Sequence, residues 1–229
     1  SFDARGDTEQ ATIQSMQARM PSGTLDAKGN VRWAPVLEWN ADTTLAGFDP
    51  GYFAPEFPGR IQGRIATRGK ARADGGVDAS FDAPSLRGTL RGRALDARAK
   101  VDLHGSDIDG DVAIAIGGSR ASAKGRVGAT LSVDARFEPL RLDDLLPGAG
   151  GVLRGTATLR GPRTTPDIAA DLTGDGLHWG DWRAASLRAN GSLPWRTGNG
   201  TLHVEASGIE AGLAIDHLVV DARGAMERL

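Results

Sequence analysis

The sequence has no cysteine among its 229 residues, so it holds neither a disulfide framework nor a thiolate metal site. Aromatic residues make up only 5%, and no apolar run approaches the roughly 18 residues of a membrane-spanning helix. The chain starts on a polar stretch, without the apolar core of a signal peptide. A net charge of −2 gives no reason to expect nucleic acid as a partner. Because aromatic residues are few, we expect a core made of Val, Ile, Leu and Ala.

Glycine, in contrast, is abundant: 32 of 229 residues, about twice the usual share. Between the glycines, apolar and polar residues alternate with a period of two, and the clearest runs are Val77–Phe81, Leu95–Leu103, Leu131–Phe137 and Leu202–Ala206. Side chains of a strand point to alternate sides, so each run predicts a strand with one apolar and one charged face. The alternation therefore predicts an all-β fold.

Short clusters of Gly, Pro and Asp separate these runs and predict turns: Asp74–Gly76, Asp82–Pro84, Gly117–Ser119, Thr173–Gly176 and Gly198–Gly200. Strands about every 10 to 12 residues are typical of an antiparallel meander. Only Ala11–Arg19 and Leu140–Leu146 fit a helical pattern, and both are short. We therefore expect less than about 10% helix, against a usual share of about 30%.

Two stretches of the chain repeat at a constant offset of 92 residues, as in Gly59/Gly151 (151 − 59) and likewise Gly63/Gly155 and Gly69/Gly161. The offset predicts one structural unit used twice, at about 39–105 and 131–197, within a single β segment over 1–229. Each copy holds a Pro-bounded segment, Pro50–Pro58 or Pro139–Pro147, expected to lie off the sheet interior as a small cap. Because both ends interrupt a pattern, we expect a piece of a longer protein.

Catalytic and metal-binding motifs are missing from the sequence. The four histidines, His104, His178, His203 and His217, are scattered and are interpreted as solvated surface residues. Asp107–Asp111 begins like a calcium loop, but Val112 stands where that loop needs Gly, so a turn is the better interpretation. Asp143 and Asp144 are interpreted as a polar helix face. We expect neither enzymatic activity nor a cofactor or bound metal.

The basic series Arg87, Arg91, Arg93 and Arg98 is interpreted as a solvated face, balanced by Asp82, Asp96 and Asp102. The opposite, apolar face of the predicted sheet has no helix to cover it. Such a sheet either closes into a sandwich with an ordinary core or keeps an apolar trough open. Composition alone favours the closed sandwich, and both alternatives stay open at this point.

One stretch resembles a known family. Trp33, Pro35 and Trp39 are followed by G-F-D-P-G (47–51), by P-E-F-P-G-R-I-Q-G-R (55–64) and by Gly69, and a second copy runs from Leu153 to Ile168. This order is similar to the periplasmic repeat region of the TamB family, relatives of AsmA-like and bridge-like lipid transfer proteins. The resemblance covers Gly23 to about Val220.

The resemblance implies a β-taco: a long, curved antiparallel sheet folded into a U-shaped trough with an apolar interior. It implies the periplasm of a Gram-negative bacterium, in a protein anchored in the inner membrane. It also implies phospholipid transport between the membranes, support of outer-membrane biogenesis and protein secretion, and a TamA-like barrel partner that binds parts of the protein outside this chain. The family has no catalytic residues to carry over.

The leading hypothesis is a lipid-conducting segment whose groove is lined by the apolar positions of the strands: Ile61, Ile65, Val77, Phe81, Leu86, Leu90, Leu95, Val101, Val112, Ile114, Ile116, Leu131, Val133, Phe137, Leu153, Ile168, Leu172, Leu187, Leu202 and Val204. The alternative is a chaperone-like scaffold that pairs its sheet edges with strands of client β-barrel or autotransporter proteins. A carbohydrate-active jelly roll is disfavoured, because no acid pair with aromatic platforms is present.

Overall fold

The structure, a computed structural model, describes residues 1–194 and 200–224. These residues fall into two compact units, one within Ser1–Ile116 and one within Gly117–Leu229. The first unit contains β1 (Phe2–Gly6), β2 (Gln10–Met20), β3 (Gly23–Arg32), β4 (Glu38–Phe48), β5 (Gly59–Ala71), β6 (Val77–Leu90), β7 (Arg93–His104) and β8 (Asp107–Ile116). The second contains β9 (Ser119–Val127), β10 (Thr130–Arg141), β11 (Ala149–Pro162), β12 (Asp167–Trp179), β13 (Trp182–Leu193), β14 (Gly200–Glu210) and β15 (Ala214–Gly224).

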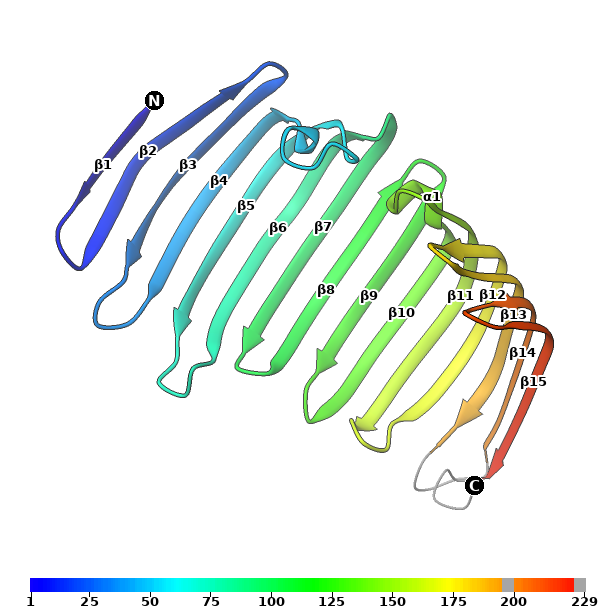
Figure 1. Cartoon of the computed structure of the whole chain (residues 1–229). Coiled ribbons are helices and arrows are strands. Elements are labelled where there is room, and N and C mark those ends of the chain that lie inside the picture. The colour runs from blue at the N-terminus through cyan, green and yellow to red at the C-terminus, as the bar shows by residue number, and fades with distance from the viewer. Residues whose placement is uncertain (195–199, 225–229) are drawn as a thin grey trace. The chain divides into compact units, whose positions relative to one another are not determined.

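Within each unit, every strand pairs antiparallel with the next strand in the chain, from β1 to β8 and from β9 to β15 (Figure 1). The described helical segments are short: the 3-10 turn η1 (Pro50–Tyr52) and the single helical turn α1 (Leu142–Leu145). In the second unit the sheet curls, so that β13 to β15 turn strongly away from the direction of β9 (Figure 1). The predicted all-β antiparallel fold with little helix is confirmed.

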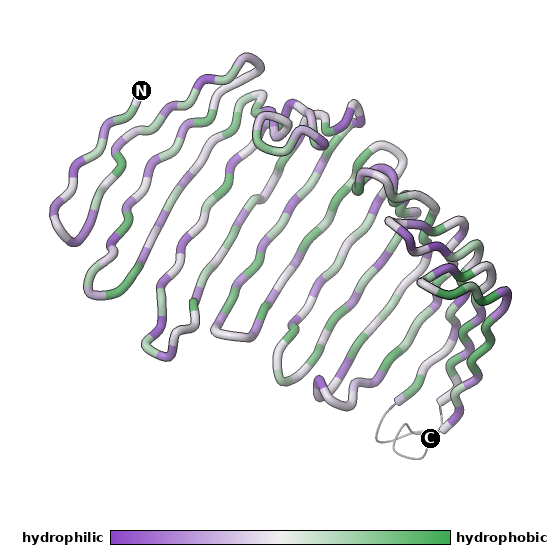
Figure 2. Tube along the Cα trace, in the orientation of Figure 1, coloured by the Kyte–Doolittle hydropathy of each residue, from purple (hydrophilic) through white to green (hydrophobic). Residues whose placement is uncertain are grey.

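Hydropathy alternates along the strands, as the sequence predicts, and polar and apolar residues follow one another along most of them (Figure 2). Ala11–Arg19, one of the two stretches with a helical pattern, lies inside β2 and is extended. The predicted spacing of 10 to 12 residues is too short, because most strands are themselves 10 to 14 residues long and the turns add to this.

Three predicted turns lie inside strands instead. Asp82–Pro84 belongs to β6, where the ladder with β7 shifts between Ala83 and Leu86. Thr173–Gly176 belongs to β12, where Gly176 has φ +58°. Residues Asp107–Asp111 begin β8 as a regular strand. Proline and glycine mark β-bulges as well as turns, because a bulge also leaves a residue outside the ladder. The predicted turn Gly198–Gly200 falls almost wholly outside the described residues.

The two Pro-bounded segments occupy matching places in their units. Both β4 and β10 carry a bulge near their end, between Leu45 and Phe48 in one and between Phe137 and Leu140 in the other, again 92 residues apart. η1 follows the first bulge and α1 the second. Pro139 is counted within β10 but sits in its bulge, so it has no register partner. The predicted end of the second repeat, residue 197, lies outside the described residues.

Several strand glycines have a backbone conformation that other residues rarely adopt. Gly88, Gly125 and Gly155 have φ values of +139°, +141° and +114°, and a Cβ atom built on them would lie 1.9, 1.7 and 1.8 Å from a carbonyl oxygen of the neighbouring strand. Such a position tolerates only glycine. The high glycine content therefore serves the interior of strands as well as turns.

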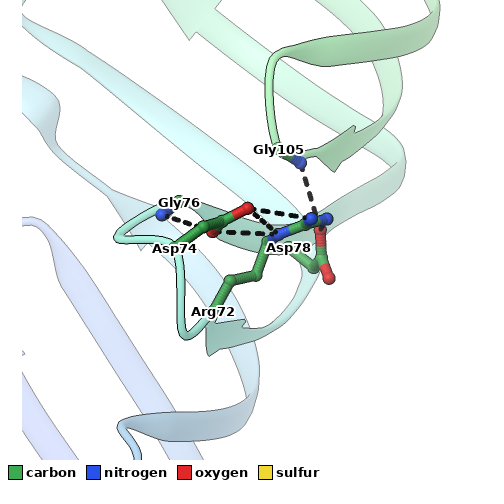
Figure 3. A network of polar contacts seen from close by, with 5 residues as sticks. All are labelled: Arg72, Asp74, Gly76, Asp78 and Gly105. Atoms are coloured by element: carbon green, nitrogen blue, oxygen red, sulfur yellow. Dashed lines mark hydrogen bonds and ion pairs between the residues drawn. The ribbon is translucent and has the colours of Figure 1, made fainter.

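A polar network joins two neighbouring hairpin tips in the first unit (Figure 3). The Arg72 guanidinium donates to Asp74, with Nη2 3.0 Å from Oδ2, and to Asp78, with Nη1 3.3 Å from Oδ1. Asp78 also accepts the backbone N–H of Gly105 in the β7–β8 turn at 3.1 Å. The Arg72 hydrogen bonds, helped by the N–H of Gly76, lower the pKa of Asp74.

We predict that this network gives an acid-sensitive contribution to stability. Because the folded-state pKa of Asp74 is below its unfolded value of about 4, the contribution is present above that value and is lost as pH falls through the folded pKa. Asp74→Asn should therefore lower the urea midpoint at pH 7, and its difference from wild type should shrink below pH 4. Asp181→Asn, in an exposed turn, is the control. If the difference in urea midpoint between Asp74→Asn and wild type does not change with pH, the prediction is contradicted.

Candidate functional site

The candidate site is the apolar face of the sheet, whose membership follows from the strand register. Register partners in an antiparallel ladder point to the same face, as do residues two apart on one strand. In the first unit one such row crosses the sheet through Ile61, Gly88, Leu95 and Ile116. This rule places all eleven predicted lining residues of that unit on one face: Ile61, Ile65, Val77, Phe81, Leu86, Leu90, Leu95, Val101, Val112, Ile114 and Ile116.

The second unit gives the same result. One row runs from Val133 through Leu159 and Ile168 to Leu193, and another from Phe137 through Gly155 to Leu172. The nine predicted lining residues of this unit again share one face: Leu131, Val133, Phe137, Leu153, Ile168, Leu172, Leu187, Leu202 and Val204. Their role in binding lipid stays a prediction.

Exposure distinguishes the two alternatives that the sequence left open. Of the twenty predicted lining residues only Leu95 and Ile116 are buried, Phe81 is exposed at 37%, and the other seventeen are half-buried. The buried apolar residues of the described chain are few: Leu45, Ala83, Leu95, Ile116, Leu140, Ala149, Leu177, Ala184, Leu193 and Ala206. A dry sandwich core would bury most of the face. The closed sandwich that composition favours is therefore wrong.

Sequence reasoning missed some members of the same face. The register adds Leu45, Leu103 and Leu159, and it adds Trp39, whose ring lies over Gly69 on the next strand. A Cβ on Gly69 would lie 2.3 Å from that ring, and the Trp39 indole N–H donates to Thr67 Oγ1 at 3.2 Å. These residues follow the same period of two in the sequence. The strand register then shows that they share the face of the predicted lining residues.

A lane of small residues crosses the apolar face of the second unit. Its members are register partners on five successive strands: Ala123, Ala135, Ala157, Ala170 and Gly191. Larger side chains flank it, with Val133 and Leu159 on one side and Phe137 and Leu172 on the other. The lane thus runs perpendicular to the strands, along the direction in which the sheet grows.

The opposite face is polar and balanced in charge. Arg87 pairs with Asp96 at 3.2 Å, as expected, whereas Arg98 pairs with Asp111 of β8 at 3.7 Å. Two hollows over β4 to β7, of about 330 and 310 Å³, share the lining residues Asn40, Arg68, Ser80 and Asp102. Charged and polar side chains make up most of their walls, which suits water better than an acyl chain.

The titratable groups mostly stand where the sequence places them. His104, His178 and His217 are exposed, while His203 is half-buried beside Asp221, with 2.7 Å between Nδ1 and Oδ1. Residues 1–194 and 200–224 contain no group of three His, Cys, Asp or Glu side chains arranged to hold a metal ion. Nor does any helix in these ranges have the length and hydropathy needed to cross a membrane.

One prediction about a carboxylate is wrong. Asp144 of α1 is buried rather than part of a polar face, and its Oδ2 accepts the hydroxyl of Ser119 at 2.5 Å. The same hydroxyl oxygen accepts the backbone N–H of Arg141 at 2.9 Å. This bond ties the α1 cap to the start of β9. A contact between residues 25 apart leaves no trace in local periodicity, so the sequence pattern did not indicate it.

The chain is similar to a known protein family. A family model described as "TamB, N-terminal domain" matches residues 1–228. The translocation and assembly module subunit TamB of Haemophilus influenzae is 21% identical over 214 residues, which cover 92% of this chain and 16% of that protein. The chain therefore spans about a sixth of the length of this relative. No solved structure gives a match.

Proposed function

The match over residues 1–228 shows that this chain belongs to the TamB family. From this membership and the apolar face, we propose that the chain carries phospholipid acyl chains along its sheet. In this proposal it is a segment of a longer periplasmic protein, anchored in the inner membrane, that supports outer-membrane biogenesis with a TamA-like barrel partner. It performs no catalysis and uses no cofactor.

The observation that carries the proposal is the apolar face with half-exposed side chains. Burying an acyl chain against such a surface favours transfer from water by about 0.8 kcal/mol per CH₂ group. Leu131, Val133 and Phe137 offer apolar surface of this kind without an enclosing pocket. An open face binds many chains weakly, and a carrier needs this property because lipid must enter and leave.

In this proposal, lipid moves across the strands, in the direction in which the sheet grows. The small-residue lane from Ala123 to Gly191 runs across the strands, so an extended chain lying in it passes from strand to strand. The lane meets no charged side chain, because the charged positions of β10 and β11, such as Asp134 and Arg160, belong to the opposite face. A lipid therefore moves along the sheet rather than along a strand.

The alternative proposal is a chaperone-like role, in which client β-barrel strands pair with the protein by backbone hydrogen bonds. Its support is the exposed apolar surface of β15, where Leu218, Val219 and Val220 are 39–45% exposed. Apolar side chains of a client strand could pack against this surface.

Extraction of the purified chain tests the leading proposal. We expect phospholipid to be released into organic solvent from protein expressed in a Gram-negative host, and to be identified by mass spectrometry. The matched control is a protein of the same size with a closed core, purified in the same way. Lipid-free protein that instead captures unfolded barrel strands would favour the alternative.

A further inference from the structure

The feature that carries a further inference is the aromatic group at η1 in the first unit. Phe48 ends β4 and is the register partner of Ile61, so it belongs to the apolar face. The ring of Phe53, just after η1, stacks on it with 6.2 Å between centroids and an interplanar angle of 17°. Tyr52 meets Phe53 edge-on at 5.4 Å. The cap thus extends the apolar face with two further rings.

These two rings are unusually accessible. Tyr52 is 68% exposed and Phe53 is 74% exposed, more than the other large apolar side chains of the described residues. Their contacts with each other and with Phe48 leave most of each ring uncovered. A structural role in holding the fold would bury these rings, so their exposure indicates a surface used for something else.

The cap is nevertheless held in a fixed place. Asp49 precedes η1, and its Oδ1 accepts the backbone N–H of Gly51 at 2.9 Å and that of Gly59 at 2.8 Å. One carboxylate oxygen therefore joins the start of the cap to the start of β5. η1 belongs to the short coiled loop that connects the end of β4 to the start of β5 (Figure 1). The aromatic rings stand at the end of an apolar row that continues through Ile61 to Leu95.

We propose that Tyr52 and Phe53 form a side wall of the lipid path, against which an acyl chain lying on the apolar face of the first unit packs. This inference rests on the proposed lipid function and adds a contact that alternation alone does not indicate. Continuity with the apolar face through the Phe48–Phe53 stack selects an acyl chain as the occupant. The Tyr52 hydroxyl gives the wall a polar rim, as aromatic residues do at a membrane interface.

The described part of the second unit has no such wall at the corresponding cap. At the 92-residue offset, Asp144 stands in the place of Tyr52 and Leu145 in that of Phe53 (52 + 92 and 53 + 92). Asp144 is buried against Ser119, so this cap is closed by a hydrogen bond rather than opened by aromatic rings. The two caps therefore offer different surfaces: exposed aromatic rings in the first unit and a buried carboxylate in the second.

Photocrosslinking in living cells tests the wall. The photoreactive amino acid p-benzoyl-phenylalanine replaces one residue at a time in the full protein: Phe53 in the wall, Ile65 on the apolar face, or Gln62 on the polar face. After irradiation, purified protein is analysed by mass spectrometry for covalent phospholipid adducts. We expect adducts at positions 53 and 65, with at least tenfold less at position 62.

The outcomes separate the two proposals. Adducts at position 65 without adducts at position 53 overturn the wall and leave the lipid path intact. Absence of adducts at both positions contradicts the proposed function itself. As a second measurement, Phe53→Ala should reduce co-purified phospholipid at least twofold without lowering the melting temperature, because its ring is mostly exposed. Unchanged lipid content in this variant would also overturn the wall.

Discussion

Val133→Asp should remove most co-purified phospholipid while the protein stays folded. The Val133 side chain is half-buried on the apolar face of β10, so a carboxylate there keeps part of its hydration. We expect a cost of about 1–2 kcal/mol in folding, within the ordinary range of point mutations. An acyl chain passing an uncompensated charge meets a far larger barrier, and lipid content should fall at least about tenfold. The measurements are a melting curve and quantitative lipid extraction.

The matched control lies one residue away on the same strand. Asp134 faces the polar side and pairs with Arg160, with 2.5 Å between Oδ1 and Nη2. Asp134→Val loses this exposed ion pair, which costs at most about 1 kcal/mol, and lipid content should remain near that of wild type. If Val133→Asp instead unfolds the protein, the charge has entered a dry core, where an unpaired charge costs about 3–5 kcal/mol. That outcome would contradict the open apolar face.

The second large effect concerns a strand glycine. Gly125 in β9 has φ +141°, and a Cβ atom on it would lie 1.7 Å from the carbonyl oxygen of Ser132 in β10. Gly125→Ala must therefore break the pairing of these strands or force them apart. We expect the free energy of unfolding to fall by about 3–5 kcal/mol, because backbone strain and overpacking both destabilise the folded state. The melting temperature should fall by about 10 °C.

Another strand glycine provides the comparison. Gly110 in β8 lies on the apolar face opposite Val101, and a Cβ atom on it would meet nothing nearer than 4.0 Å. Since its φ is not in the left-handed region, Gly110→Ala should change the free energy of unfolding by less than about 1 kcal/mol. Equal melting temperatures for the two variants would refute the idea that steric conflict, rather than chain flexibility, requires Gly125.

Periodicity predicted the strands and their faces well, because the side-chain period of a strand is a local property. Leu95, Ala97, Ala99, Val101 and Leu103 alternate in the sequence and share one face in the structure. The same pattern does not predict where a strand begins or ends. Asp82–Pro84 has the composition of a turn, yet β6 continues through it as a bulge, since β5 and β7 supply partners on both sides.

Features that depend on distant residues were beyond the sequence pattern. The burial of Asp144 follows from its hydrogen bond to Ser119, which lies in a different strand. The stack of Phe53 on Phe48 likewise depends on how the chain turns after Asp49. Composition also favoured a closed sandwich that the structure does not have. A content of 40% apolar residues is enough to build such a core but does not require one. Register, not composition, determines which side chains meet.

Each strand in a unit contacts almost only the strands before and after it in the chain. Such an arrangement has the energetics of a one-dimensional array, in which stability is a sum of local terms. Adding or deleting a pair of strands lengthens or shortens the array, and the pairing and connections of the other strands stay the same. The distance that a protein of this kind bridges is therefore open to evolutionary change by tandem duplication, and the 92-residue offset between Gly59 and Gly151 has the form that one such duplication leaves.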